Sequence, residues 1–215
     1  MTTMTTMTTI TTITKSTLTS GLLVGSALAL AVGAVLAAQG ANRRPASPAG
    51  SASTQIGSNW IDVTYSRPLK RGRDVFGSGA TYGAITHTDG APLWRAGANV
   101  STRLKTDAPL VINGKTVPAG EYSVFIDVKT PTDWTFILSN WPAQTTYDPN
   151  NKAALWGSFG YTPDKDVVRA PMRVSQTATS VDELTWLFVD VTPAGGSLEI
   201  AWDKTVALVP FKVGA

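Results

Sequence analysis

Residues 121–128, "EYSVFIDV", alternate apolar and polar side chains along most of their length. The even-numbered positions are all apolar, and the odd-numbered positions are polar except for Phe125. A period of two is the spacing of a strand that buries one face and exposes the other, because successive side chains of a strand point to opposite sides. The stretch therefore predicts a half-buried β-strand.

The same alternation recurs from residue 59 to the end of the chain. Asn113-Gly114 in "VINGKTV" is a strong signal for a tight hairpin turn between two of these runs. Residues 184–191, "LTWLFVDV", are apolar on both faces and predict a central strand, and residues 150–156 hint at a short helix. Many short strands separated by turns predict an all-β fold, an antiparallel β-sandwich or jelly-roll-like single domain whose core is supplied largely by the seven tryptophans. The further runs cover residues 60–65, 100–104, 133–139, 168–174, 197–202 and 205–213.

The first 58 residues have a different composition. Residues 1–20 repeat a threonine triplet and predict a disordered leader, whereas residues 21–38 carry no charge and end in small side chains. That apolar run predicts either a secretory signal cleaved near Ala37 or an uncleaved membrane-anchor helix. Residues 39–58 are small, polar and rich in proline and serine, which predicts a flexible linker before a domain at residues 59–215. Either interpretation exports the domain to the periplasm or outer cell envelope, free or anchored to the inner membrane.

The bulk composition excludes several kinds of site. The chain of 215 residues has no cysteine and one histidine, so disulfides, thiolate metal sites and histidine-rich metal sites are excluded. Its net charge of +3 is too small for the dense basic surface of a nucleic-acid binder. We therefore expect no cofactor, no metal and no nucleic-acid partner, and contact with a membrane only through an uncleaved N-terminal segment.

Two stretches combine arginine with aromatic residues: residues 65–77, "YSRPLKRGRDVFG", and residues 94–99, "WRAGAN". Arginine offers a rigid fork of donors that suits carboxylate, phosphate or sulfate oxygens, and tryptophan offers a flat face for a cation or sugar ring. Buried arginines also serve as struts that donate to backbone carbonyls, and the pattern favours that role for Arg95 beside a core Trp94. The candidate ligand-binding residues are Tyr65, Arg67, Arg73, Trp94, Arg95 and Asn99.

A series of short motifs occurs in order along the domain, at residues 65–68, 72–73, 76–77, 94–99, 119–123, Tyr161, 166–169 and Trp202. The series resembles the bacterial exported family known as domain of unknown function 2911. The resemblance implies an exported β-rich domain and brings no established activity or catalytic residue. Two departures are Val100, where related chains often place an acidic residue, and an apparent insertion at residues 84–92.

Three functions fit these patterns. The first is a non-catalytic module that binds a small anion or an acidic envelope glycan through the arginine and tryptophan loops. The second is a hydrolase that works through a carboxylate such as Glu121 or Asp74 beside an arginine. The third is a structural or assembly domain, which predicts an exposed apolar patch in place of a pocket. We favour the binding module.

Overall fold

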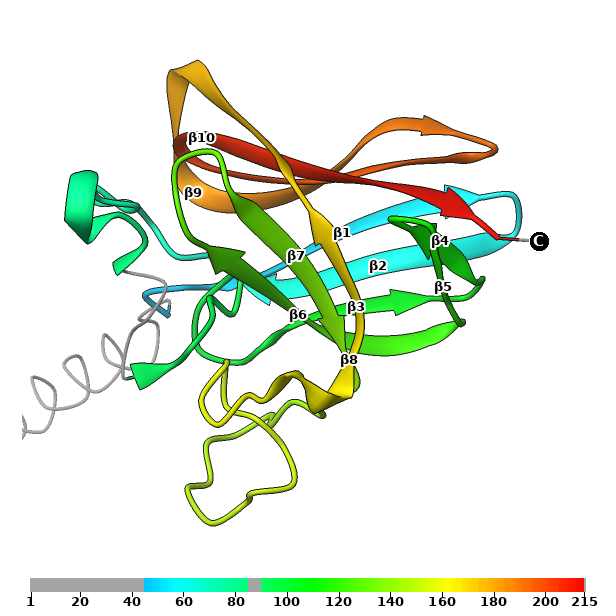
Figure 1. Cartoon of the computed structure of the whole chain (residues 1–215), viewed down its shortest axis with the longest axis horizontal. Coiled ribbons are helices and arrows are strands. Elements are labelled where there is room, and N and C mark those ends of the chain that lie inside the picture. Colours follow the sequence, from blue (N-terminus) through cyan, green and yellow to red (C-terminus); the bar gives the residue numbers. More distant parts are fainter. Residues whose placement is uncertain (1–44, 85–89, 215) are drawn as a thin grey trace, which may run out of the picture. The chain divides into compact units, whose positions relative to one another are not determined.

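A computed structural model describes residues 45–84 and 90–214 as two antiparallel sheets packed face to face. Figure 1 shows the layers, with β9 in orange and β10 in red against the strands of the other sheet. The prediction of an antiparallel β-sandwich is therefore confirmed. The larger sheet has the order β1-β2-β3-β6-β7-β8, and its strands are β1 (Ala49–Ile56), β2 (Asn59–Ser66), β3 (Thr102–Thr106), β6 (Gly120–Val128), β7 (Trp134–Ser139) and β8 (Asp166–Pro171).

The smaller sheet has the order β5-β4-β10-β9. Its two short strands, β4 (Leu110–Ile112) and β5 (Lys115–Val117), form the hairpin predicted at Asn113-Gly114. Two long strands, β9 (Arg173–Thr192) and β10 (Gly195–Val213), form the rest of the sheet and pair along their length with irregularities in register. The described residues hold no α-helix, only short 3-10 turns such as η1 (Gly79–Thr81) and η3 (Pro163–Lys165).

The core lies between the two sheets and is rich in aromatic rings. Phe76 packs against three tryptophans, with ring centroids 5.0 Å from Trp134, 5.8 Å from Trp94 and 6.0 Å from Trp202. All four side chains are at most 5 % exposed. Tilted and edge-on ring contacts of this kind add to the free energy gained from burying large apolar surfaces. Trp94 is therefore a core residue, as the sequence indicated.

The N-terminal boundary of the domain differs from the prediction. Residues 39–58 were expected to form a flexible linker, yet β1 occupies Ala49–Ile56 and pairs with all of β2. Gly57 turns the chain between them in the left-handed region, at φ 63°. β1 is an edge strand whose odd-numbered side chains face solvent, so small polar residues suffice and its sequence looks like a linker. The leader and the apolar run at residues 21–38 lie outside the described residues, and no described helix could cross a membrane.

Three finer predictions are also corrected. Residues 150–156 form turns and a single bridge instead of a helix. Residues 184–191 belong to β9, which is an edge strand and leaves Leu187 and Val191 more than a third exposed. Only four of the seven tryptophans are buried in the core. Of the other three, Trp60 lies on the outer face of β2 and two lie on a surface loop.

Candidate functional site

The outer face of the six-stranded sheet carries a row of polar side chains. Strand register pairs Ser51 with Thr64, Thr64 with Arg103, and Arg103 with Ser123. Residues that are directly opposite in antiparallel strands project on the same face, so these side chains form one line across four strands. The line continues to Ser139 on β7.

A long connection between β7 and η3, which we call the covering loop (residues 140–162), packs over part of this outer face. Buried Leu155 anchors it on Phe125 and Ile137, the outward apolar residues of β6 and β7, and this second apolar cluster is separate from the main core. Ser101 Oγ donates to the Gly157 carbonyl at 2.5 Å, and Ser158 Oγ donates to the Leu93 carbonyl. Apolar burial and buried hydrogen bonds therefore hold the loop in one position.

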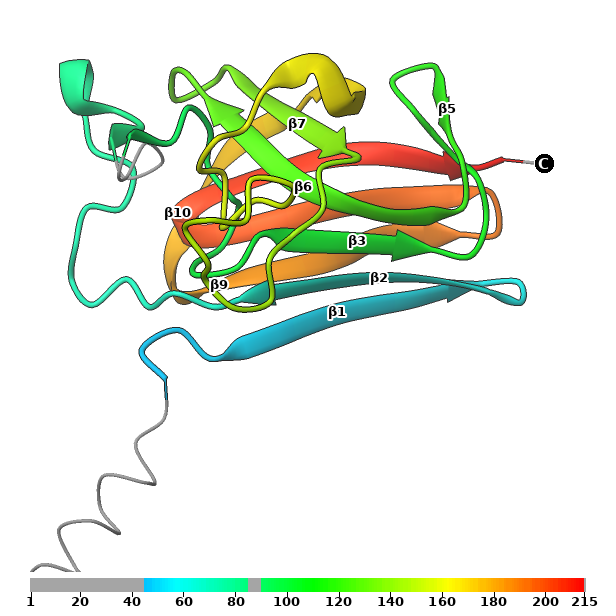
Figure 2. The same cartoon turned by 90° about the horizontal axis from the view of Figure 1, so that it is seen from below.

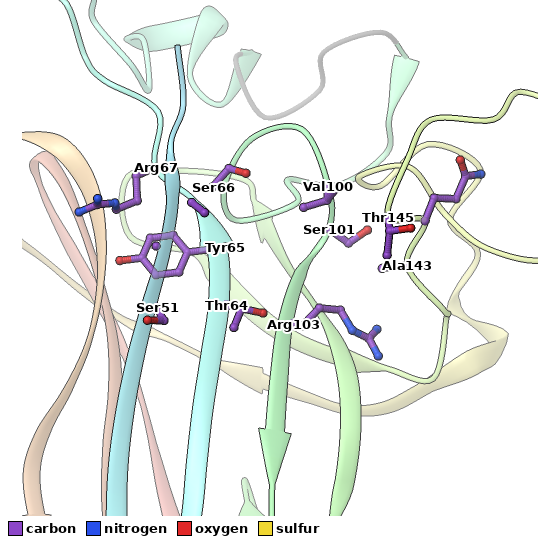
Figure 3. A pocket seen from close by; sticks show the side chains of 13 residues that line it. Ser51, Thr64, Tyr65, Ser66, Arg67, Val100, Ser101, Arg103, Ala143 and Thr145 are labelled. Atoms are coloured by element: carbon purple, nitrogen blue, oxygen red, sulfur yellow. The ribbon is translucent and has the colours of Figure 1, made fainter. Parts of the chain in front are cut away.

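A cleft of about 770 Å³ opens between the ends of β1, β2 and β3 and the covering loop. Its exposed hydroxyl side chains are Ser51, Thr64 and Thr145. In the view of Figure 3, Thr64 lies on one side of Val100 and Ser101, and Ala143 and Thr145 of the loop lie on the other. The complete lining is Ala49, Gly50, Ser51, Thr64, Tyr65, Ser66, Arg67, Val100, Ser101, Arg103, Ala143, Gln144 and Thr145. The lining includes two arginines and no acidic residue.

Arg103 is the most constrained charged group of this cleft. Its Nε donates to Glu121 Oε1 at 3.0 Å, and its Nη1 donates to Ser123 Oγ at 2.6 Å and to the Trp141 carbonyl at 3.2 Å. Nη2 has no acceptor among the described residues, and the side chain is 20 % exposed. Glu121 is 56 % exposed, so the carboxylate lies toward solvent while the guanidinium lies lower in the site. The guanidinium of Arg103 is thus held in one orientation by three acceptors, and its Nη2 has no acceptor among the described residues.

Two of the predicted ligand-binding residues are buried in structural roles. Trp94 lies in the core, and its main chain pairs with Ile126 of β6. Tyr65 is 5 % exposed and accepts a hydrogen bond from the Trp186 backbone N–H through its hydroxyl at 3.1 Å. Trp186 in turn donates through Nε1 to the Ala96 carbonyl at 3.0 Å. These contacts join the end of β2 to β9 and to the loop at residues 94–99.

Arg67 and Arg73 occupy different surroundings. Arg67 lines the cleft through its stem, which packs against Gly50, but its Nη1 pairs with Glu183 of β9 at 3.2 Å. Figure 3 shows Arg67 directed away from Arg103. Its Nε is buried and has no partner among the described residues. Arg73 lies outside the cleft and donates to the carbonyls of Leu69 and Lys70.

Arg95 contacts the covering loop, whereas Asn99 is exposed. Arg95 Nη1 donates to the Asn99 carbonyl at 2.7 Å, which makes Arg95 a strut to a loop carbonyl, one of the partners expected for it. The guanidinium packs directly against Gly157, at φ 62°, where any side chain would collide with it. Asn99 itself adopts a left-handed turn conformation at φ 59°. The structure therefore does not bring the six predicted residues together, and their role in ligand binding stays a prediction.

The sequence did not single out Arg103. Its signal was present, because Arg103 alternates outward in a strand-like run and Glu121 and Ser123 do so in another. What the sequence lacked was the register of β3 against β6, which places these outward residues beside one another.

Among the residues that the structure describes, no acidic side chain lines this cleft, where the hydrolase hypothesis would need a carboxylate pair. Glu121 is committed to Arg103, and Asp74 accepts the backbone N–H of Gly77 at 3.0 Å. Within the described part of the chain, no three His, Asp or Glu side chains converge as a metal site would require.

A second polar cluster lies on the β8 side of the covering loop. Tyr161 Oη donates to Asp166 Oδ2 at 2.6 Å, and Arg169 Nη1 donates to the same oxygen at 2.7 Å. Burial, together with the hydrogen bond to Asp166, raises the pKa of the Tyr161 phenol above its ordinary value. Arg169 Nη2 also lies 3.6 Å from Asp127 Oδ2 on β6, so the cluster connects the end of the covering loop to β6 and β8.

Comparison with known proteins supports the resemblance found in the sequence. The model of the family described as "Protein of unknown function (DUF2911)" matches residues 47–211, a range that begins just before β1 and ends within β10. No curated protein and no solved structure matches the chain. The matched range covers most of the chain and both sheets except the last two residues of β10, and the protein therefore belongs to the DUF2911 family.

Proposed function

We propose that this protein is a non-catalytic binding module whose cleft takes a small organic anion or the acidic group of an envelope glycan. The observation that carries the proposal is Arg103, which is held by three acceptors and keeps Nη2 without an acceptor among the described residues. A fixed guanidinium binds a carboxylate or phosphate with little further loss of side-chain entropy.

The surroundings of Arg103 suit such a ligand. The cleft lining contains no Asp or Glu, so no acidic side chain of the lining repels an anion. The exposed hydroxyls of Ser51, Thr64 and Thr145 can both donate and accept, as the hydroxyls of a sugar require. Arg67 forms part of the cleft wall with its aliphatic stem, while its guanidinium forms an ion pair with Glu183.

Binding can be measured by titrating the full-length chain with galacturonate, sulfate and phosphate while following tryptophan fluorescence. The Trp141 carbonyl accepts from Arg103, so a ligand at Arg103 is expected to perturb a local fluorophore. Arg103→Gln should weaken galacturonate binding about 10- to 100-fold, since a charge-assisted hydrogen bond contributes roughly 1.5–3 kcal/mol. Arg173→Gln, an exposed arginine on β9, is the matched control.

Arg103→Lys tests whether the fork matters beyond the charge, and it should recover only part of the affinity. Circular dichroism should show that each variant is folded. Unchanged affinity in folded Arg103→Gln would remove the cleft from the proposal.

We further propose that the domain is exported to the periplasm or outer envelope by the apolar segment at residues 21–38. Sequencing the N-terminus of the protein recovered from cell fractions tests this. A start near Ala38 in the periplasmic fraction supports cleavage, an intact start in the membrane fraction supports an anchor, and cytoplasmic protein with an intact start contradicts export.

A further inference from the structure

Three aromatic residues of the covering loop remain accessible. Tyr147 and Phe159 are 57 % and 56 % exposed, and Trp156 is half-buried, with its ring centroid 5.8 Å from that of Tyr147. These rings line a groove of about 240 Å³. The four core tryptophans show that this chain readily buries such rings, so the exposure on the loop calls for a ligand or partner.

The groove is held open by a buried amide. Gln144 is 7 % exposed, and its Nε2 donates to the carbonyls of Asn151 and Ala154 at 3.0 and 2.9 Å. Its Oε1 accepts the Asp148 backbone N–H at 2.8 Å. Because one side chain ties both limbs of the loop together, the rings are presented on an ordered frame and little ordering entropy remains to be lost on binding.

The groove adjoins the cleft. Gln144 lines both, while its neighbours Ala143 and Thr145 line the cleft and Tyr147 and Asp148 line the groove. One short run of the covering loop therefore leads from the hydroxyl-rich cleft to the aromatic rings.

Building on the proposed function of the cleft, we propose that the groove is a second subsite and that the ligand is an acidic oligosaccharide. Its acidic group binds at Arg103, and a neighbouring pyranose ring packs its C–H face on Tyr147 and Trp156. A sugar ring has an apolar face and a polar edge, which matches rings flanked by Asp148, Asn151 and Lys152. A simple inorganic anion would use the cleft and leave the groove unused.

The test compares the affinities of galacturonate and tetragalacturonate for the full-length chain by calorimetry. In the unmodified protein the tetramer should bind at least about tenfold more tightly than the single sugar, because it reaches both subsites. Tyr147→Ala and Trp156→Ala should each reduce that advantage about three- to tenfold and leave the affinity for galacturonate unchanged. Thr146→Ala, an exposed neighbour, is the control, and Tyr147→Phe should retain the advantage.

The outcomes separate the two proposals. Galacturonate binding that depends on Arg103, with no advantage for the tetramer or one that survives Tyr147→Ala and Trp156→Ala, overturns the second subsite and leaves the cleft in place. If the unmodified protein does not bind galacturonate but binds the tetramer in a way that depends on Trp156, the cleft is not an anion site and the proposal of one continuous site is overturned. Equal affinity for tetragalacturonate and uncharged cellotetraose contradicts an acidic ligand, and absence of binding by every sugar contradicts both proposals.

Discussion

The two faces of the six-stranded sheet both bury large apolar side chains, but they bury them against different parts of the molecule. The inner face packs Phe136 and Trp134 against the other sheet, while the outer face buries Phe125 and Ile137 under a single loop. Figure 2 shows the strands of this sheet against the long β9 and β10. The inner face therefore depends on the whole sandwich, whereas burial on the outer face depends on the 23 residues of the covering loop, three of which line the cleft. Side chains that are buried to the same extent can therefore stabilise either the sandwich or the position of the covering loop.

The largest expected effect comes from paired truncations on neighbouring strands. Phe136 and Phe125 are both fully buried but point to opposite faces. Phe136→Ala should lower the free energy of unfolding by about 3–5 kcal/mol, as measured by urea denaturation, because it opens a cavity in the main core. Phe125→Ala should release the covering loop, which limited proteolysis would detect as new cleavage within residues 142–160 of a still folded sandwich.

The distinction would fail if Phe125→Ala unfolded the sandwich as completely as Phe136→Ala without prior cleavage of the loop. The two faces would then form one cooperative unit.

A glycine pair probes how the loop is seated. Gly157 and Gly114 both have positive φ, but a side chain at Gly157 would collide with Arg95, whereas a side chain at Gly114 meets open space. Gly114→Ala should cost about 1 kcal/mol from backbone strain. Gly157→Ala should cost about 1–3 kcal/mol more, because overpacking is added to the strain.

Urea denaturation measures both costs. Adding Arg95→Ala to Gly157→Ala should recover part of the loss by removing the collision. Equal costs at the two glycines would show that the loop yields freely around Arg95.

The smallest effect concerns charges on the two outer faces. Burial, together with repulsion from Asp190, raises the pKa of Glu199 on β10. With the folded pKa raised, ionisation of Glu199 lowers stability as pH rises through the window above its ordinary pKa of about 4.3. Glu199→Gln should therefore stabilise the protein at pH 7 by less than about 1 kcal/mol, and the gain should vanish at pH values below about 4.

Glu121→Gln is the contrasting variant, because Glu121 on the other outer face pairs with Arg103. It should destabilise slightly at pH 7, by less than about 1 kcal/mol. Thermal unfolding of both variants at pH 4 and pH 7 measures the two effects, and shifts of the same sign at pH 7 would contradict the assigned environments.

Several features were predictable because they depend on local pattern. Period-two alternation identified β2, β3, β6, β7 and β10, and Asn113-Gly114 identified a hairpin. β1 was missed because an edge strand with small residues lacks a strong alternation, and the position of β9 at an edge was missed because strand order is set by long-range pairing. The pattern of aromatic residues beside arginines allowed both a ligand site and structural struts, and it favoured the second: Trp94 packs in the core and Arg95 donates to a loop carbonyl.

The sequence by itself determined an all-β domain, its main strands and turns, and its family, because alternation and short motifs are properties of neighbouring residues. Only the tertiary structure decided that Arg103 meets Ser123 and the Trp141 carbonyl, and that one glutamine links a cleft to an aromatic groove. These contacts depend on strand register and on how the covering loop packs. Both are set by contacts between residues far apart in the chain.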